Sequence, residues 1–278
     1  MSVIVTGPGV YDIPEDVYHR DDSLASELGR SLSQSGAKVL LECPARFVYE
    51  RDHGRPPKEE YDVGHLAHRL TLGTGARIRV VDAYDWQTRA AQAARKAARE
   101  AGETPVHRGT LLAGSRMARA VRRHPAASAI LSAGRPEVSF YWIDPDTGVT
   151  CRGRADWLRD NGIADLKFLV DASPTGFAKA AAAYGWDMQA AYYTDGLYAL
   201  TGQWLPFLFI AVEKTRPHLV GVYRLDDEAM ESGRARNRAA LRQYAEYESL
   251  DWWPGYGDDI TDVSLPRWRT RPYLEVTL

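Results

Sequence analysis

The sequence is poor in cysteine and has no long apolar run, and both absences exclude classes of protein. Its two cysteines, Cys43 and Cys151, are too few for a disulfide framework or for a zinc or iron-sulfur site held by cysteine alone. No apolar run reaches the roughly eighteen residues of a membrane-spanning helix. The beginning of the chain also lacks the basic start and apolar stretch of a signal peptide. The sequence therefore predicts a cytoplasmic protein with no membrane partner.

An excess of charge of one sign is also missing. The formal net charge is -2, which neither favours nor excludes a polyanionic partner. Of the 35 basic residues 29 are arginine, the type that suits bidentate contacts with phosphate. A GC-rich genome produces the same bias without any function, and composition does not separate the two explanations. The hydrophobic fraction of 45% is enough to bury a substantial core.

Most of the N-terminal half is predicted to be helical. The opening residues contain turn formers and predict a strand or extended arm followed by a loop. Helix is then predicted within residues 31–55, where Pro44 kinks or divides it. Its N-terminal cap is one of three serines, Ser31, Ser33 or Ser35. Arg30 lies just before the start of this helix. An arginine and a helix N-terminus both suit a terminal 5′ phosphate, which makes Arg30 a candidate contact for one. A short helix is predicted over residues 62–73.

Two consecutive helices with basic faces are predicted over residues 85–101 and 109–132. In the second helix four arginines recur at helical spacing and share a face: Arg116, Arg119, Arg122 and Arg123. A solvated helix face explains them without any function. Two neighbouring basic helices also suit the phosphates of a nucleic acid, with Arg119 and Arg123 as candidate contacts.

After Gly134 the pattern changes to short segments rich in β-branched and aromatic residues. These segments are residues 137–144, 150–158 and 163–170. Strong turn signals separate them, which predicts an antiparallel meander of three strands. Helix returns over residues 174–201 with a break at Gly185, two more strands follow, and a long helix runs over residues 227–249. No internal repeat or domain boundary is visible, so we predict a single α/β domain over residues 1–278.

Three charged side chains fall within the meander, where a sheet core would be expected. Because side chains alternate across a strand, Asp165 and Lys167 point to one face and Leu166 to the other. The turn signal Asn161-Gly162 folds the preceding strand back and can bring Asp156 beside that pair. An Asp–Lys ion pair on a solvent-facing strand is the simplest explanation of the motif.

The same residues also fit a magnesium site. Magnesium prefers oxygen ligands, which Asp156, Asp165 and the backbone carbonyl of Leu166 can supply, and Mn²⁺ is expected to substitute. Lys167 would orient or help to deprotonate the attacking water and offset charge at phosphorus. Glu137 opens the meander and is either a further ligand, directly or through water, or a surface glutamate.

Asp156 followed by Asp165-Leu166-Lys167 resembles the signature of PD-(D/E)XK nucleases, and the pattern around it resembles their RecB-like and RecE-like exonuclease branch. Four further motifs match in chain order: the Ser-rich helix SLSQSGAKVLLECPARFVYE with its Cys-Pro; GHLAH with Gly64 and His68; EVSFYW with Glu137; and QAAYY with Gln189 and Tyr193. The resemblance spans about residues 30–225, the core of the domain, and leaves a C-terminal helix and an irregular tail over residues 226–278.

This resemblance implies a fold, a catalytic centre and a reaction. The fold would be an α/β nuclease core with a mixed central sheet flanked by helices and with extra N-terminal helices. The metal and catalytic centre would consist of five residues: His68, Glu137, Asp156, Asp165 and Lys167. Gln189 and Tyr193 would support the substrate or the strand that carries the lysine. The reaction would be hydrolysis of linear double-stranded DNA from its ends, 5′ to 3′, in phage-type recombination.

Partners follow from the same resemblance. A ring-forming homo-oligomer and a single-strand annealing protein are expected, in the cytoplasm of a bacterium or phage host. Members with an iron-sulfur cluster pair the Cys-Pro cysteine with three cysteines near the C-terminus, and since no cysteine follows Cys151, no cluster is expected here.

Two alternatives remain open: a single-strand or structure-specific nuclease of the same superfamily, and a non-catalytic DNA-binding protein that retains the fold. Loss of an acidic ligand or of the lysine would mark the non-catalytic protein, and here every position is filled.

These interpretations lead to a geometric expectation. The carboxylates of Asp156 and Asp165 should lie close enough to share one metal ion, and His68 should point into the same cleft. A His68 buried elsewhere would instead be a core histidine, and Gln189 and Tyr193, four residues apart on one helix face, could simply pack.

Overall fold

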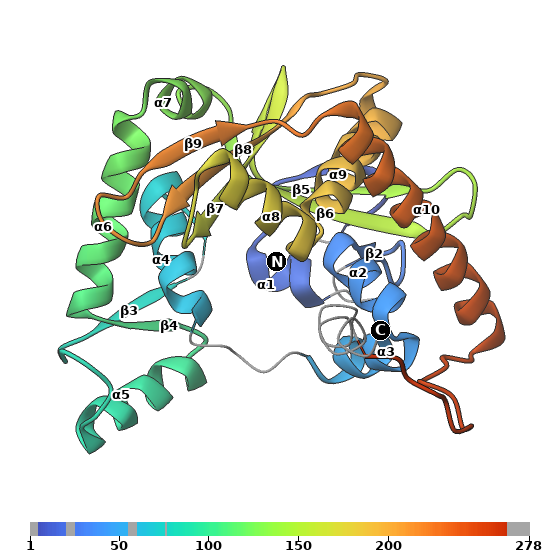
Figure 1. The fold of residues 1–278 in the computed structure, drawn as a ribbon, viewed down its shortest axis with the longest axis horizontal. Coiled ribbons are helices and arrows are strands. Elements are labelled where there is room, and N and C mark those ends of the chain that lie inside the picture. The colour runs from blue at the N-terminus through green and yellow to red at the C-terminus, as the bar shows by residue number, and fades with distance from the viewer. Residues whose placement is uncertain (1–4, 21–25, 55–59, 76, 266–278) are drawn as a thin grey trace, which may run out of the picture.

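A mixed sheet runs through the part of the chain that the structure, a computed structural model, describes: residues 5–20, 26–54, 60–75 and 77–265 (Figure 1). Its strands lie in the order β1-β5-β6-β7-β8-β9, and β2 pairs with β6 off this path. The bounds are β1 Gly9–Tyr11, β2 Leu32–Ser33, β5 Arg135–Ile143, β6 Thr150–Arg159, β7 Gly162–Leu169, β8 Phe207–Glu213 and β9 Val220–Tyr223.

The predicted meander is confirmed, because β5, β6 and β7 are neighbouring antiparallel strands. β7 then pairs with β8 in parallel, and β9 closes that edge in the antiparallel sense. The turn between β6 and β7 consists of Asp160 and Asn161, since Gly162 already pairs with Arg159. The turn predicted at Asn161-Gly162 is therefore shifted by one residue.

Helices cover both faces of the sheet, as predicted for the fold class. Around one apolar core lie α2 (Gln34–Glu42), α3 (Pro44–His53), α8 (Pro174–Tyr184), α9 (Trp186–Thr201) and α10 (Asp227–Leu250). Around the other lie α4 (Glu60–Leu72), α6 (Arg108–Arg123) and α7 (Pro125–Leu131). Strand β7 contributes Ile163 to the first core and Leu166 to the second, which is the alternation of a strand buried on both faces.

Local sequence explains several helix boundaries. The hydroxyl of Ser33 accepts a hydrogen bond from the Gly36 N–H and caps α2, so one of the three candidate serines is the cap. Pro44 begins α3 directly after the end of α2, and Gly185, with a left-handed φ of 69°, separates α8 from α9. The predicted breaks at Pro44 and Gly185 are confirmed.

Two predictions in the N-terminal half need correction. Residues 109–132 form two helices, because Pro125 lacks the N–H that a continuous helix needs, and the His124 side chain accepts a hydrogen bond from Ala127 N–H to cap the second. At the N-terminus the predicted strand is present as β1, but the loop predicted after it contains α1 (Glu15–Arg20). We call residues 9–20 the N-terminal arm.

A projecting unit between α4 and α6 was not predicted as such. Strands β3 (Ile78–Val81) and β4 (Thr104–His107) pair in parallel, and α5 (Arg89–Glu100) connects them at the lower left of Figure 1. Only α5 was expected, with a start four residues earlier than observed.

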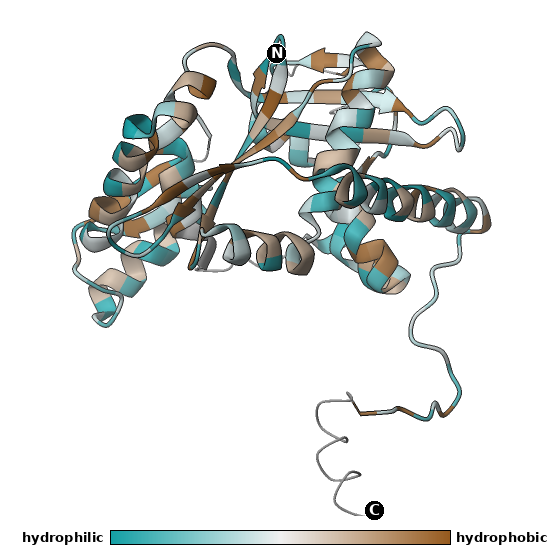
Figure 2. Ribbon diagram, turned by 45° about the horizontal axis from the view of Figure 1, so that its top comes forward, coloured by the Kyte–Doolittle hydropathy of each residue, from teal (hydrophilic) through white to brown (hydrophobic). Residues whose placement is uncertain are grey.

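The chain leaves the body of the molecule after α10. Trp253 still packs on Phe47 and Tyr244, and the Pro254 carbonyl accepts a hydrogen bond from the Ala45 N–H of α3. Farther along, the chain runs outward, and Ile260 and Val263 are largely exposed (Figure 2). No helix in the described ranges combines the length and the apolar character that crossing a membrane requires.

Candidate active site

Strand β6 changes its neighbour along its length, and this opens a fork in the sheet. Its ladder with β7 ends at the pair Trp157–Ala164, whereas Cys151 and Arg152 pair with β2. Between these points β6 has no strand partner on that side among the described residues. The Asp156 carboxylate crosses the fork and accepts a hydrogen bond from the Leu166 N–H at 2.8 Å.

The sheet is also distorted beside the fork. Glu137 has a φ of 54°, a left-handed conformation that is uncommon outside glycine. Ala155 and Leu158 both pack in the first core although they are three residues apart, so the in-and-out alternation of β6 slips between them. Such backbone strain persists where the surrounding contacts fix it, and it clusters at functional sites.

Three side chains from separate elements converge at this distortion. His68 of α4 lies between two carboxylates, with Nδ1 3.1 Å from Glu137 Oε1 and Nε2 3.0 Å from Asp156 Oδ2. Burial alone would lower the pKa of His68, but the two carboxylates outweigh it and raise that pKa to about 9. Burial raises the pKa of Glu137, while the pKa of Asp156 is lowered because His68 offsets its burial.

Asp165 and Lys167 form the adjoining part of the site. Lys167 Nζ lies 2.6 Å from Asp165 Oδ2, and the Gln189 side chain bridges the pair: Nε2 donates to Asp165 Oδ1 at 2.7 Å, and Oε1 accepts from Lys167 at 2.8 Å. Asp165 is only 3% exposed, and burial together with the Asp156 charge raises its pKa to about 6. The ammonium of Lys167 also lies 5.1 Å from the centre of the Trp186 ring.

The structure thus brings together all five residues proposed as the catalytic centre, and His68 points into it rather than into the core. Gln189 contacts the lysine strand, the second of the two roles expected for it. Tyr193 is buried, and its ring packs on Phe140 and Phe207, so it supports the sheet and offers no open surface to a substrate. The Leu166 carbonyl leaves β7 on the same side as the N–H that binds Asp156, toward the fork.

The donor set fits a divalent cation. Within the described residues, one ligand atom each from His68, Glu137 and Asp156 lie within 4.8 Å of one another. One imidazole nitrogen and carboxylate oxygens suit Mn²⁺ or Mg²⁺. Asp165 is not a member of this group, and its oxygens face Lys167 and Gln189. The three-residue group is therefore narrower than the ligand set expected from the sequence.

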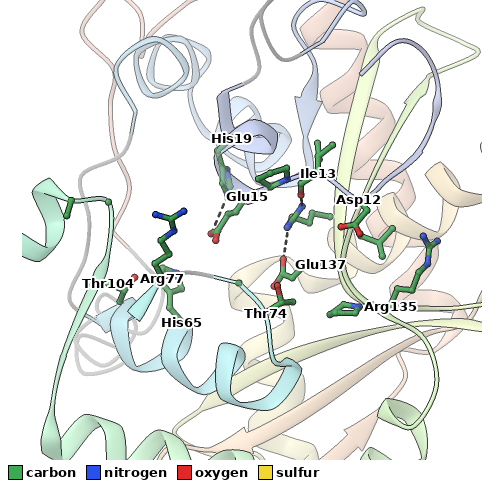
Figure 3. A pocket seen from close by; sticks show the side chains of 17 residues that line it. Asp12, Ile13, Glu15, His19, His65, Thr74, Arg77, Thr104, Arg135 and Glu137 are labelled. Carbon is green, nitrogen blue, oxygen red and sulfur yellow. Dashed lines mark hydrogen bonds and ion pairs between the residues drawn. The ribbon is translucent and has the colours of Figure 1, made fainter. Parts of the chain in front are cut away.

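A cleft of about 1020 Å³ leads to this cluster (Figure 3). The N-terminal arm, α4, the loop after it, the tips of β3 and β4, and the start of β5 form its walls. The residues that line it include Arg77, Arg135, Glu137 and Arg154. Gly75 lies next to the cluster with a φ of 106°, and a Cβ there would be 3.5 Å from Glu137 Oε1. That distance is an ordinary contact, so it is the positive φ, which residues with a side chain rarely adopt, that favours glycine here.

The arginines predicted to contact phosphate do not line the cleft. Arg30 is half exposed and forms an ion pair with Asp52 at 3.6 Å. All four arginines predicted to share a face of α6 are exposed: Arg116, Arg119, Arg122 and Arg123. Arg122 also donates a hydrogen bond to the Leu70 carbonyl at 2.9 Å.

Apart from Glu137, the residues that line the cleft were not among the site residues predicted from the sequence. Arg154 could have been found, because it lies two residues before Asp156 on one strand and period-two spacing puts both on one side. Arg77, Arg135 and the N-terminal arm carry no such signal, since only the fold brings them together.

Known proteins resemble this chain in sequence or in fold. The model of a family described as a PDDEXK-like domain of unknown function (DUF3799) matches residues 33–264. The crystal structure of a candidate exonuclease from Eubacterium rectale is similar with a TM-score of 0.61 and 13% identity, covering 92% of this chain and 95% of that chain. An alkaline exonuclease from Laribacter hongkongensis matches with a TM-score of 0.27 and 16% identity, covering 70% of this chain and 96% of that chain. No curated protein matches the sequence.

Proposed function

Because the chain belongs to the DUF3799 family of PDDEXK-like domains, we propose that it is a metal-dependent DNA exonuclease that hydrolyses phosphodiester bonds at the ends of linear duplexes. The observation that carries the proposal is the convergence of His68, Glu137, Asp156, Asp165 and Lys167 at the fork of the sheet. The name of the Eubacterium rectale neighbour fits the same activity.

In this proposal the site residues have three roles: metal binding, orientation of the attacking water, and positioning of the catalytic side chains. His68, Glu137 and Asp156 would hold the divalent ion, which supplies charge stabilisation to the phosphodiester and activates water. Lys167 stands beside Asp165, where its ammonium can orient the attacking water and offset charge on the phosphate. Gln189 fixes both side chains from α9, so their geometry does not depend on the substrate.

Finer features rest on the motif order rather than on the site. The RecE-like pattern supports 5′ to 3′ polarity, Mg²⁺ as the metal with Mn²⁺ as a substitute, and a role in phage-type recombination. It also supports a ring-forming homo-oligomer and an annealing partner in a bacterial or phage-host cytoplasm. We treat residues 1–278 as one nuclease domain, since helices as far apart as α2 and α10 pack around the same core.

Digestion of linear, 5′-phosphorylated duplex DNA with Mg²⁺, compared with a covalently closed circle, tests the proposal. We expect loss of the linear DNA and survival of the circle, because the substrate is a duplex end. Cutting of the circle, or of single strands alone, would favour the structure-specific or single-strand nuclease. DNA binding without digestion under Mg²⁺ or Mn²⁺ would identify a non-catalytic binding protein.

The DNA path can be located by comparing arginines. Arg77 and Arg135 are exposed in the cleft, and no ion pair between described residues involves either of them. We expect Arg77→Ala and Arg135→Ala each to weaken DNA binding about 10-fold, since a hydrogen bond to a charged group contributes about 1.5 kcal/mol or more. Fluorescence anisotropy with Ca²⁺ in place of Mg²⁺ measures this without hydrolysis.

Arg119→Ala and Arg123→Ala are the matched controls, because they remove exposed arginines from α6 outside the cleft. We expect them to bind DNA like the native protein. A larger loss in these controls than in the cleft variants would place the DNA on the α6 surface instead.

A further inference from the structure

Arg154 connects the candidate metal cluster to the wall of the cleft. Its Nε donates to Glu137 Oε2 at 2.7 Å, and its Nη1 donates to Ser139 Oγ at 2.6 Å and to the Ile13 carbonyl at 3.0 Å. The side chain is 12% exposed, and its guanidinium lies 5.7 Å from the centre of the Tyr18 ring. One arginine therefore contacts β5 and the N-terminal arm at the same time.

Glu137 depends on this contact for its orientation. One of its carboxylate oxygens faces His68 and the other faces Arg154, so the two partners together fix the plane of the carboxylate. The backbone of Glu137 is left-handed, a conformation that persists only where surrounding contacts determine it. The guanidinium of Arg154 is planar and donates to three acceptors at once, so it can hold the Glu137 carboxylate rigidly, as a metal ligand requires.

We propose that Arg154 is a positioning residue that holds Glu137 in the orientation for metal binding and ties the N-terminal arm to that carboxylate. The inference rests on the proposed function, because it assigns Glu137 to the metal. Arg154 itself does not contact the metal or the reacting atoms. Outer residues of this kind typically change metal affinity 10- to 100-fold when they are removed, which is about the effect expected here.

Arg152 is a matched control on the same strand. Its guanidinium also lies over the Tyr18 ring, at 5.4 Å, and its Nη1 donates to the carbonyl and hydroxyl of Ser31. Like Arg154 it is partly buried and tethers another segment to β6, but no ion pair joins it to Glu137 among the described residues. Replacing Arg152 therefore removes a comparable contact with the Tyr18 ring but leaves the ion pair between Arg154 and Glu137 in place.

The test measures Mn²⁺ binding to the full chain without DNA, by calorimetry, for the native protein, Arg154→Met, Arg154→Lys and Arg152→Met. We expect Arg154→Met to weaken Mn²⁺ binding about 10- to 100-fold. The Mn²⁺ concentration that half-saturates DNA hydrolysis should rise by the same factor, with activity recovering at high Mn²⁺. Arg154→Lys keeps the positive charge but has fewer hydrogen-bond donors, so its Mn²⁺ affinity should lie between those of the native protein and Arg154→Met. The Mn²⁺ affinity of Arg152→Met should be close to that of the native protein.

Native Mn²⁺ affinity in Arg154→Met would overturn the inference, as would an equal loss in Arg152→Met or the absence of Mn²⁺ binding by the native protein. Arg154→Lys keeps the comparison decisive if Arg154→Met does not fold. Native protein that binds Mn²⁺ but hydrolyses no DNA would contradict the proposed function alone, because the calorimetric comparison still decides the role of Arg154.

Discussion

Lys167→Ala is expected to hydrolyse linear DNA about 10²- to 10⁴-fold more slowly than the native protein, the range typical of a lost acid-base or proton-transfer group. Lys167 provides the ammonium beside Asp165 and is held there by Gln189, and alanine removes that ammonium. The effect should appear in kcat, while DNA affinity measured with Ca²⁺ changes little, because one lysine is a small part of the DNA contact.

Lys214→Ala is the control for this variant. Lys214 follows Glu213 at the end of the neighbouring strand β8 and so repeats the acid-lysine sequence, but it is exposed. We expect native activity from it. Retention of more than a tenth of native activity by Lys167→Ala, with a native thermal unfolding temperature, would remove Lys167 from the mechanism.

The second large effect is expected for Asp156→Asn, which removes one charge from the candidate metal cluster. We expect hydrolysis to fall at least about 10³-fold, since a bound metal contributes several kcal/mol of charge stabilisation to the transition state. Asparagine retains an oxygen that can accept a hydrogen bond from the Leu166 N–H, so this contact across the fork should remain and the unfolding temperature should change little. Calorimetry should show Mn²⁺ binding strongly weakened in the same variant.

Asp160→Asn serves as its control, because Asp160 is an exposed aspartate in the turn of the same hairpin. It should keep both Mn²⁺ binding and activity. If Asp156→Asn bound Mn²⁺ like the native protein, the cluster around His68 would not be the metal site.

Local pattern was sufficient for most elements of the fold. Period-two alternation with turn signals located β5, β6 and β7, and Pro44 and Gly185 marked helix ends because each restricts the backbone. Pro125 restricts the backbone in the same way as Pro44, but one helix was predicted across it, whereas the structure has α6 and α7. The parallel pair β3 and β4 could not be foreseen, since its strands are short and separated by α5.

The sequence indicated which residues form the candidate site but not how they are arranged. Side-chain alternation places Asp165 and Lys167 on one face, and the structure shows them in contact. The position of Glu137 depends on a left-handed φ, and the fork depends on β6 pairing with β2, a contact between distant segments. Neither has a local signature, so the grouping of His68 and Glu137 with Asp156, apart from Asp165, needed the fold.

Arginine composition was the least informative signal. The predicted contacts Arg119 and Arg123 lie on an exposed helix side, where solvation is explanation enough. Arg154, by contrast, is partly buried and donates hydrogen bonds to acceptors from β5 and the N-terminal arm. The difference lies in tertiary surroundings, which residue type and helical spacing do not encode.

The order of the site residues along the chain affects when they can assemble during synthesis. All five residues of the candidate catalytic centre, from His68 to Lys167, emerge from the ribosome before Gln189 and the parallel neighbour β8. At about 5–20 residues per second, the charged hairpin waits seconds for the side chain that fixes it. A chain that ends before α9 therefore contains Asp165 and Lys167 but lacks the Gln189 contacts that fix them. We expect such a fragment to be inactive.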